Sequence, residues 1–242
     1  MIQKLTGIVI RETKINEADK MLTVLTCEIG PVSVLAKNIR KNKSKISAAA
    51  GFLCYSDFVL SGGPDVYYIN QCSLIESFFK ISDDIQKLAL AAYLGNITAD
   101  LSPIGEPQPE AVKLFLNTLY VLANTDKNIF LIKSVFELRL MMCQGYMPDV
   151  FSCSNCGGEN YPFYFDIKNA NVVCVNCGKT AYEVTQPLMY ALRYILTCEQ
   201  KKIFSFEIDE TLCRKLADIT KAYVLNVLGY SPKTLEYFES MI

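Results

Sequence analysis

Residues 21–45 of the chain read MLTVLTCEIGPVSVLAKNIRKNKSK, and the fold assignment depends on this stretch. Met21–Cys27 alternates branched apolar and polar side chains, which is typical of a β-strand with one buried face. Gly30-Pro31 predicts a turn, and Val32–Ala36 then resumes the strand pattern. The stretch therefore predicts two neighbouring strands followed by a basic segment.

Further short strands flank this stretch on both sides. Gly7–Arg11 precedes it, while Ser56–Ser61 and Val66–Ser77 follow it and are joined by the hairpin-type turn Gly62-Gly63-Pro64-Asp65. Five short strands within about 80 residues favour a small closed barrel. The five-stranded OB-fold is the commonest nucleic-acid-binding barrel of this size, and an SH3-like barrel is the alternative.

From Ser82 onward the apolar period becomes helical. Ile85, Leu88, Ala89 and Ala92 are spaced to form one buried face. Further helices are predicted at Pro109–Ala123, Asn128–Gln144, Thr185–Cys198 with Thr185 as its cap, Glu210–Leu228 capped by Asp209, and Lys233–Met241. Arg139, between two leucines of one of these helices, is a possible buried charge, for which we expect an acidic partner.

Four cysteines form two copies of the pattern C-x-N-C-G, separated by seventeen residues. Each C-x₂-C places two thiolates on one tight turn, and a following glycine with positive φ lets backbone N–H groups turn toward the sulfurs. A hairpin of Tyr161–Asp166 and Ala170–Val173, turning at Lys168-Asn169, would bring the two turns together. Two redox-active pairs are the alternative, but that interpretation needs a βαβ context. The pattern predicts one structural Zn²⁺ per chain, held by Cys153, Cys156, Cys174 and Cys177.

The predicted fold class is therefore multi-domain α and β. An N-terminal OB-fold β-barrel precedes an α-helical domain with an inserted four-cysteine zinc ribbon. The predicted boundaries are 1–80 for the nucleic-acid-binding barrel, 81–150 and 183–242 for the two parts of the helical domain, and 151–182 for the zinc ribbon.

The six remaining cysteines are isolated in the sequence. In a reducing compartment, a lone cysteine among apolar neighbours is most simply a small core residue, and we expect this of Cys27, Cys54, Cys72, Cys143, Cys198 and Cys213. The N-terminus lacks the pattern of a signal peptide, and the apolar stretches are shorter than the ~20 residues that span a bilayer. We expect a soluble, cytoplasmic protein with no membrane partner.

The composition excludes several catalytic classes. The 242 residues include ten cysteines but no histidine and no tryptophan. Without histidine the chain cannot build a Ser-His-Asp triad, a Cys-His dyad or a histidine-based zinc hydrolase. The sequence also lacks the glycine-rich patterns that cradle nucleotide phosphates. We therefore assign no catalytic residue and expect no enzyme.

Charge is distributed unevenly along the chain. The formal net charge of −1 combines +3 over residues 1–80 with −4 over residues 81–242. Five cations and no acid lie within residues 37–45: Lys37, Arg40, Lys41, Lys43 and Lys45. Such a run can be a solvated loop, or it can bind phosphates with salt-sensitive and weakly sequence-selective affinity. Nearby aromatic residues could stack bases if they are exposed, and the candidates are Phe52, Tyr55, Tyr67 and Tyr68.

Several segments in a fixed order resemble one protein family. They are Glu17-Ala18-Asp19-Lys20, Gly30-Pro31-Val32, Ala36-Lys37 before the basic run, Phe136–Leu140, Gly145–Asp149, the cysteine quartet that follows, and Leu228–Lys233. Together they are similar to the RecO family of bacterial DNA repair and recombination mediators, over essentially the whole chain. One position departs from the family pattern, because Asn38 stands where a glycine is expected in the basic loop.

The resemblance implies an N-terminal OB-fold without enzymatic turnover, in a cytoplasmic, nucleoid-associated protein. It implies binding to single- and double-stranded DNA, annealing of complementary strands, and loading of recombinase onto strands coated by single-stranded-DNA-binding protein. RecR would be a partner. It assigns DNA contact to the five cations of residues 37–45 and zinc binding to the four paired cysteines.

Two other classes of function stay open on the sequence. In a protein-interaction scaffold, the acidic helical part and the ribbon would dock partners and the basic loop would be incidental. A redox enzyme would use the spare thiols.

Overall fold

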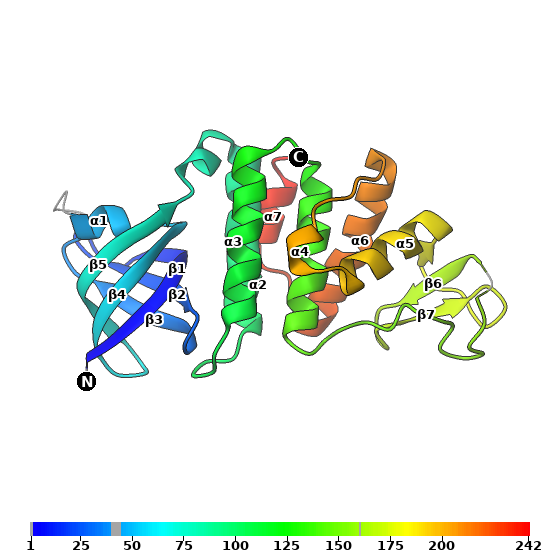
Figure 1. The fold of residues 1–242 in the computed structure, drawn as a ribbon, viewed down its shortest axis with the longest axis horizontal. Helices are drawn as coiled ribbons and strands as arrows, with labels where there is room; N and C mark the ends of the chain where they lie inside the picture. The colour runs from blue at the N-terminus through cyan, green and yellow to red at the C-terminus, as the bar shows by residue number, and fades with distance from the viewer. Residues whose placement is uncertain (1, 40–44, 160) are drawn as a thin grey trace. The chain divides into compact units, whose positions relative to one another are not determined.

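We describe a computed structural model, which covers residues 2–39, 45–159 and 161–242 (Figure 1). The chain folds into two compact units. The first comprises Met1–Ala123 together with Pro232–Ile242, and the second comprises Asn124–Ser231.

The first unit begins with a closed five-stranded barrel. Its strands are β1 (Ile2–Lys14), β2 (Lys20–Thr26), β3 (Gly30–Ala36), β4 (Cys54–Gly62) and β5 (Tyr67–Ser77). They follow the order β1-β2-β3-β5-β4, and β1 pairs with β4 to close the barrel. The pairing of β3 with β5 is parallel, whereas the other pairings are antiparallel. A short helix α1 (Lys45–Ala49) lies between β3 and β4 in the chain. This arrangement confirms the predicted OB-fold barrel.

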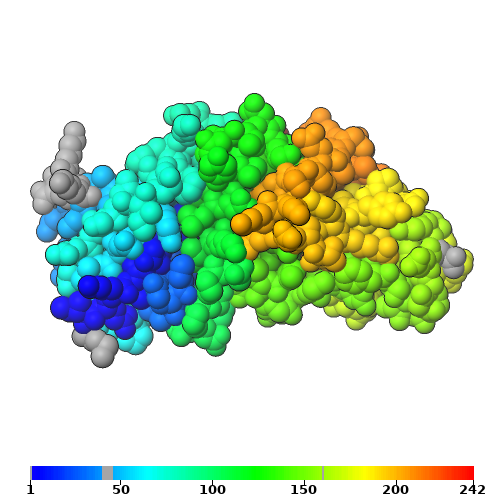
Figure 2. Space-filling view, viewed as in Figure 1, coloured from blue at the N-terminus to red at the C-terminus, as the bar shows by residue number. Residues whose placement is uncertain are grey.

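Alternating side chains fill the interior of the barrel. Leu22 and Val24 of β2, Val34 of β3, and Phe58 and Leu60 of β4 are completely buried in one apolar cluster. Their period of two is the one that a strand with a single buried face requires. On the outer surface, the dark blue residues of β1 lie beside the cyan residues of its partner β4 (Figure 2).

The predicted turn at Gly30-Pro31 is wrong in position. The turn occupies residues 27–29, and Gly30 and Pro31 already pair with β2 as the start of β3. Gly30 has a φ of 71°, and a Cβ atom there would lie 2.5 Å from the carbonyl oxygen of Pro103. Glycine is therefore required by the close approach of the segment that follows α2, a long-range contact that a local pattern does not contain.

Helices complete the first unit: η1 (Phe79–Asp83), α2 (Ile85–Leu101), α3 (Pro109–Asn124) and α7 (Lys233–Glu239). Helix α2 packs against both α7 and β1. The contact with β1 is close, since a Cβ atom on Gly95 would lie 2.6 Å from the carbonyl oxygen of Ile10. Helix α2 is consequently buried on several sides. The single buried face predicted for it is wrong, because Ile85 is 52% exposed while Leu90, Tyr93 and Leu94 are buried.

The second unit combines helices with a small sheet. Its helices are α4 (Ile129–Cys143), α5 (Gln186–Thr197), η2 (Gln200–Lys202) and α6 (Glu210–Leu228), and its strands are β6 (Phe163–Asp166), β7 (Asn171–Cys174) and β8 (Tyr182–Val184). The pairing of β6 with β7 confirms the predicted hairpin, and β8 adds a third strand that the sequence pattern did not predict. Among the described residues, no helix has both the length and the apolar character needed to cross a membrane.

The helix caps follow the prediction except at Thr185. Asp209 accepts a hydrogen bond from the backbone N–H of Leu212, as an N-cap does. Thr185 stands at the N-cap position of α5, but its hydroxyl makes no capping bond and is buried without a partner among the described residues. The Thr185 hydroxyl therefore does not cap α5, although Thr185 is at the predicted position.

Helix α4 is buried along most of its length and carries two buried cations. Lys133 forms an ion pair with Glu137, with 2.9 Å between Nζ and Oε1, and Glu137 also accepts a hydrogen bond from the Thr220 hydroxyl of α6. The acidic partner expected for Arg139 is not found among the described residues. Its guanidinium donates instead to the carbonyl oxygen and the thiol of Cys198, at the end of α5. A carbonyl oxygen at a helix C-terminus carries a partial negative charge that attracts a cation. The Cys198 carbonyl therefore has the role that we expected of a carboxylate.

Candidate metal centre and nucleic-acid interface

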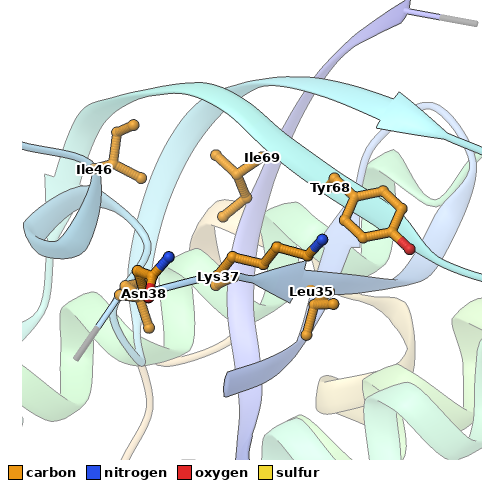
Figure 3. Close-up of a pocket in the computed structure, with 8 residues that line it drawn as sticks. Leu35, Lys37, Asn38, Ile46, Tyr68 and Ile69 are labelled. Carbon is orange, nitrogen blue, oxygen red and sulfur yellow. The ribbon is translucent and has the colours of Figure 1, made fainter. Parts of the chain in front are cut away.

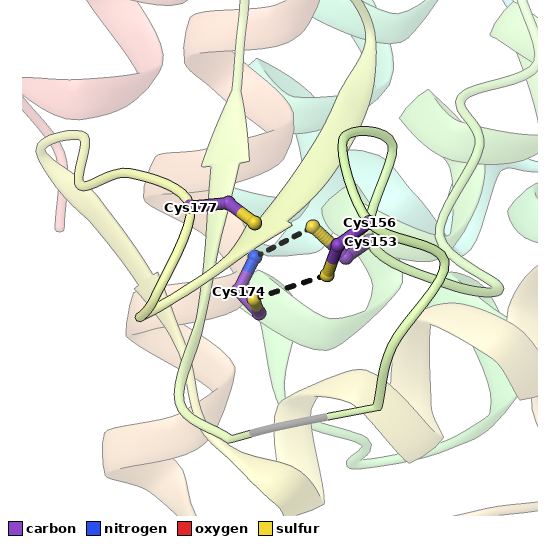
Figure 4. A group of neighbouring side chains, drawn as sticks. All are labelled: Cys153, Cys156, Cys174 and Cys177. Carbon is purple, nitrogen blue, oxygen red and sulfur yellow. Dashed lines mark hydrogen bonds between the residues drawn. The ribbon is translucent and has the colours of Figure 1, made fainter.

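The four paired cysteines meet at one point of the second unit. Cys153 and Cys156 precede β6, Cys174 ends β7 and Cys177 follows it. Their sulfur atoms all lie within 4.8 Å of one another, and those of Cys156 and Cys174 are 3.7 Å apart (Figure 4). A tetrahedron with Zn–S distances of about 2.3 Å has sulfurs about 3.8 Å apart. The cluster therefore has dimensions that suit a four-coordinate zinc ion.

Each pair lies on a tight turn closed by a glycine N–H. Gly157 donates to the carbonyl oxygen of Cys153, and Gly178 donates to that of Cys174. Gly157 has the predicted positive φ, at 68°, whereas Gly178 does not. Several backbone N–H groups reach sulfur, among them those of Gly158, 3.4 Å from the Cys156 sulfur, and Cys174, 3.2 Å from the Cys153 sulfur.

These hydrogen bonds distinguish the thiols from one another. Hydrogen bonds, first that from the backbone N–H of Cys174, lower the pKa of the Cys153 thiol to about 6, because they stabilise the thiolate. Hydrogen bonds among the thiols, first that with Cys156, raise the pKa of Cys177 to about 12. A divalent cation at the centre would favour the thiolate form of all four, which is the form that binds metal. The donor set, four sulfurs without a nitrogen or oxygen ligand, fits a closed zinc site.

Only part of the basic segment lies within the described residues. Arg40, Lys41 and Lys43 fall outside them, and Lys45 begins α1. Lys37 follows β3 and is exposed, with its Nζ atom 4.9 Å from the centre of the Tyr68 ring. A cation at this distance from an aromatic face is attracted by the ring's electrons.

The backbone after Lys37 has a defined conformation. Asn38 has a φ of 54°, in the left-handed region that glycine enters freely and asparagine tolerates better than most residues. Its N–H donates to the carboxylate of Asp19, with 2.7 Å between nitrogen and Oδ1. Asn38, at the position where the resemblance leads us to expect glycine, thus adopts a backbone conformation that glycine enters freely.

The four aromatic candidates differ in exposure. Tyr67 is buried in the barrel core, and Phe52 and Tyr55 are half-buried. Tyr68 is 39% exposed and stands next to Lys37. The structure therefore singles out Tyr68 as the aromatic side chain that a ligand at the basic segment could reach.

Lys37 and Tyr68 border a pocket of about 280 Å³ in the first unit (Figure 3). No motif in the sequence indicates this pocket, because its walls come from two strands, the turn that follows β3, and a helix. It is lined by Leu35, Ala36, Lys37, Asn38, Ile39, Ile46, Tyr68 and Ile69.

The six isolated cysteines are mostly, but not all, interior residues. Cys54, Cys72 and Cys213 are buried as predicted, and Cys27 and Cys198 are half-buried. Cys143 is exposed, so its prediction as a core residue is wrong. It is the last residue of α4, where the helix emerges from the interior.

Comparison with known proteins gives matches over nearly the whole chain. The family model described as Recombination protein O N terminal matches residues 1–78, and that described as Recombination protein O C terminal matches residues 82–236. The chain is 35% identical over 242 residues to the DNA repair protein RecO of Acetivibrio thermocellus, covering 98% of this chain and 96% of the relative. It is 31% identical over 242 residues to the protein of that name from Dehalococcoides mccartyi, with 98% and 95% covered. For the one from Caldicellulosiruptor saccharolyticus, identity is 29% over 239 residues, with 98% and 97% covered.

Proposed function

This chain belongs to the RecO family, and we propose that it acts in DNA repair as a DNA-binding recombination mediator. It binds single- and double-stranded DNA, anneals complementary strands, and helps to load recombinase onto single strands coated by single-stranded-DNA-binding protein. RecR is its partner in this task. The role requires binding and strand pairing but no chemical turnover, and we assign no catalytic residue.

The barrel with its basic segment is the observation that carries the DNA-binding part of this proposal. Lys37 is exposed beside an accessible aromatic ring, and four further cations follow it in the sequence: Arg40, Lys41, Lys43 and Lys45. Cations on long side chains neutralise phosphates without reading base sequence. A mediator needs this property, since it acts on strands of any sequence.

We assign separate roles to the predicted parts of the chain. Residues 1–80 form the nucleic-acid-binding domain, and residues 151–182 form a zinc ribbon inserted between helical parts 81–150 and 183–242. A zinc ion held here would be structural, because the four cysteine sulfurs would fill its coordination and leave no position for water or substrate. When bound, zinc joins the two cysteine turns and so stabilises the ribbon.

Binding of a labelled oligothymidine, followed by fluorescence anisotropy over a series of salt concentrations, tests the proposal. The variant Lys37→Ala/Lys41→Ala/Lys43→Ala removes three cations of the basic segment. We expect weaker binding and a salt slope of log K smaller by about two units, at roughly 0.7 per lost contact on a single strand. Annealing of complementary oligonucleotides should slow in parallel.

The matched control removes three exposed lysines elsewhere, as Lys113→Ala/Lys201→Ala/Lys202→Ala. It keeps the same net charge as the test variant, so an equal loss in both would indicate a general charge effect. If the wild-type chain binds no DNA at low salt but captures purified RecR, the proposal fails in favour of a protein-interaction scaffold.

A further inference from the structure

The pocket beside Lys37 has an apolar floor and a polar rim. Ile39, Ile46 and Ile69 are partly buried and pack against the barrel core, where they form the floor. Lys37, Asn38 and Tyr68 are exposed and form the rim. An apolar pocket with a few polar groups at its edge is the usual character of a site for a small ligand or a part of a larger one.

The parallel pairing of β3 with β5 places the Tyr68 ring at this rim. Val34 lies opposite Tyr67 and Leu35 lies opposite Tyr68. Val34 and Tyr67 are buried in the core, so alternation along each strand directs Leu35 and Tyr68 to the outer side of the barrel. The ring therefore stands on a rigid strand, with one edge of the pocket formed by its neighbour across the pair (Figure 3).

Charge around the pocket favours a polyanion. The described residues that line it include a lysine and no acid, and four more cations follow Lys37 in the sequence by position 45. An apolar peptide would gain no electrostatic attraction from this positive charge. Each nucleotide of a nucleic acid, in contrast, carries both a planar base and a phosphate. The pocket, at about 280 Å³, lies just below the ~300–1,000 Å³ typical of sites for drug-sized ligands and so suits one base.

We propose that this pocket receives a single unpaired nucleobase, stacked on Tyr68, while the Lys37 ammonium leaves the ring and contacts the adjoining phosphate. The inference rests on the proposed DNA binding and makes it more specific. Bases in a duplex are already stacked and paired, so the pocket gives the chain a preference for single strands. In the free protein the Lys37 ammonium lies against the Tyr68 ring, and the two side chains separate when DNA binds.

The absence of tryptophan from the chain makes the proposal directly measurable. The variant Tyr68→Trp has a single tryptophan, and base stacking quenches indole emission. We expect oligothymidine to quench this emission at the concentrations at which anisotropy reports binding, and an equal amount of blunt duplex to quench it far less. Tyr120→Trp, at an exposed position of α3, is the matched reporter and should be unaffected.

Two substitutions separate stacking from charge. Tyr68→Ala should weaken single-strand binding by about 5- to 150-fold with an unchanged salt slope, and Tyr68→Phe should restore it. Lys37→Ala should lower the salt slope by about 0.7. Far-ultraviolet circular dichroism checks that each variant keeps the barrel.

The inference and the proposed function fail in different ways. If anisotropy shows that the wild-type chain binds no oligonucleotide, both the proposed function and the inference that rests on it are wrong. If anisotropy shows tight binding while the emission of the Tyr68→Trp variant stays constant and Tyr68→Ala binds as the wild type does, the function stands and the base pocket is wrong. Equal quenching of the Tyr68→Trp variant by single strands and duplex would also overturn the inference.

Discussion

The Asp19 carboxylate holds the backbone N–H of Asn38, with 2.7 Å between Oδ1 and the nitrogen, although the two residues are nineteen positions apart. The other carboxylate oxygen accepts from the Asn16 side chain. Asp19 therefore links the turn before β2 to Asn38, the second residue after β3. The Asp19 carboxylate thus fixes the backbone of Asn38, the residue that follows Lys37.

We predict that Asp19→Ala weakens single-strand binding several-fold and lowers the free energy of unfolding by about 1 kcal/mol, the usual net contribution of one hydrogen bond. Anisotropy and urea unfolding measure the two effects. Asp19→Asn keeps an acceptor oxygen at the same place and should retain most of the affinity. Tighter binding by Asp19→Ala would mean that the carboxylate acts only by repelling phosphate.

We predict one zinc per chain in the purified protein, measured by atomic emission. Cys153→Ser/Cys156→Ser should lose the metal and lower the melting temperature, because the remaining pair offers two of the four ligands. Cys143→Ser removes an exposed thiol on α4 and serves as the control, with full zinc content expected. Full zinc in the double variant would require other ligands and contradict the site.

Three isolated cysteines should differ in reactivity. Burial raises the pKa of both Cys72 and Cys213 to about 11, whereas Cys143 is exposed. Iodoacetamide at pH 8 followed by peptide mass spectrometry should modify Cys143 in the native protein and modify the other two only after denaturation. Rapid labelling of Cys72 or Cys213 in the native state would support a redox role for spare thiols.

The same two thiols make stability depend on alkaline pH. Their pKa is raised on folding from the ordinary value of 9.0, so between pH 9 and about 11 the unfolded chain loses protons that the folded chain keeps. Stability is fully present below pH 9 and should fall as pH rises through this window. Urea unfolding of the wild type and of Cys72→Ala/Cys213→Ala measures it, and the variant should show a shallower decline.

The buried ion pair of α4 gives a test of packing in the second unit. Lys133→Met should lower the free energy of unfolding by about 3–5 kcal/mol, because Glu137 would remain buried without its cation. Lys133→Met/Glu137→Leu removes both charges and should recover most of that loss. A double variant less stable than the single one would show that the pair stabilises the unit beyond mutual neutralisation.

Local patterns in the sequence account for the features that depend on local chemistry. Strand alternation predicts the barrel, and the spacing of the four paired cysteines predicts their meeting point, since one hairpin suffices to join them. The predictions are wrong where a residue far away in the sequence determines a backbone conformation or a hydrogen-bond partner. Pro103 approaches Gly30 and so explains a glycine that resembles a turn residue, and Cys198, at the end of another helix, accepts a hydrogen bond from Arg139.

The contact between Lys37 and Tyr68 also depends on segments that are distant in the sequence. No spacing rule connects residues thirty-one positions apart, and the two meet because β3 and β5 lie parallel in the barrel. Sequence alone therefore identifies the cations and several candidate rings, and the strand order decides which ring they meet.

The parallel β3–β5 junction also has a consequence for the order of folding. Antiparallel neighbours such as β1–β2, β2–β3 and β4–β5 can form as local hairpins, but the β3–β5 pairing requires the intervening segment to close a larger loop. The Tyr68 ring and the Lys37 ammonium meet only when β3 and β5 have paired. Under the base-pocket proposal, a nascent chain whose hairpins have formed but whose β3–β5 pairing is absent lacks the pocket, so stacking of a base on Tyr68 requires the closed barrel.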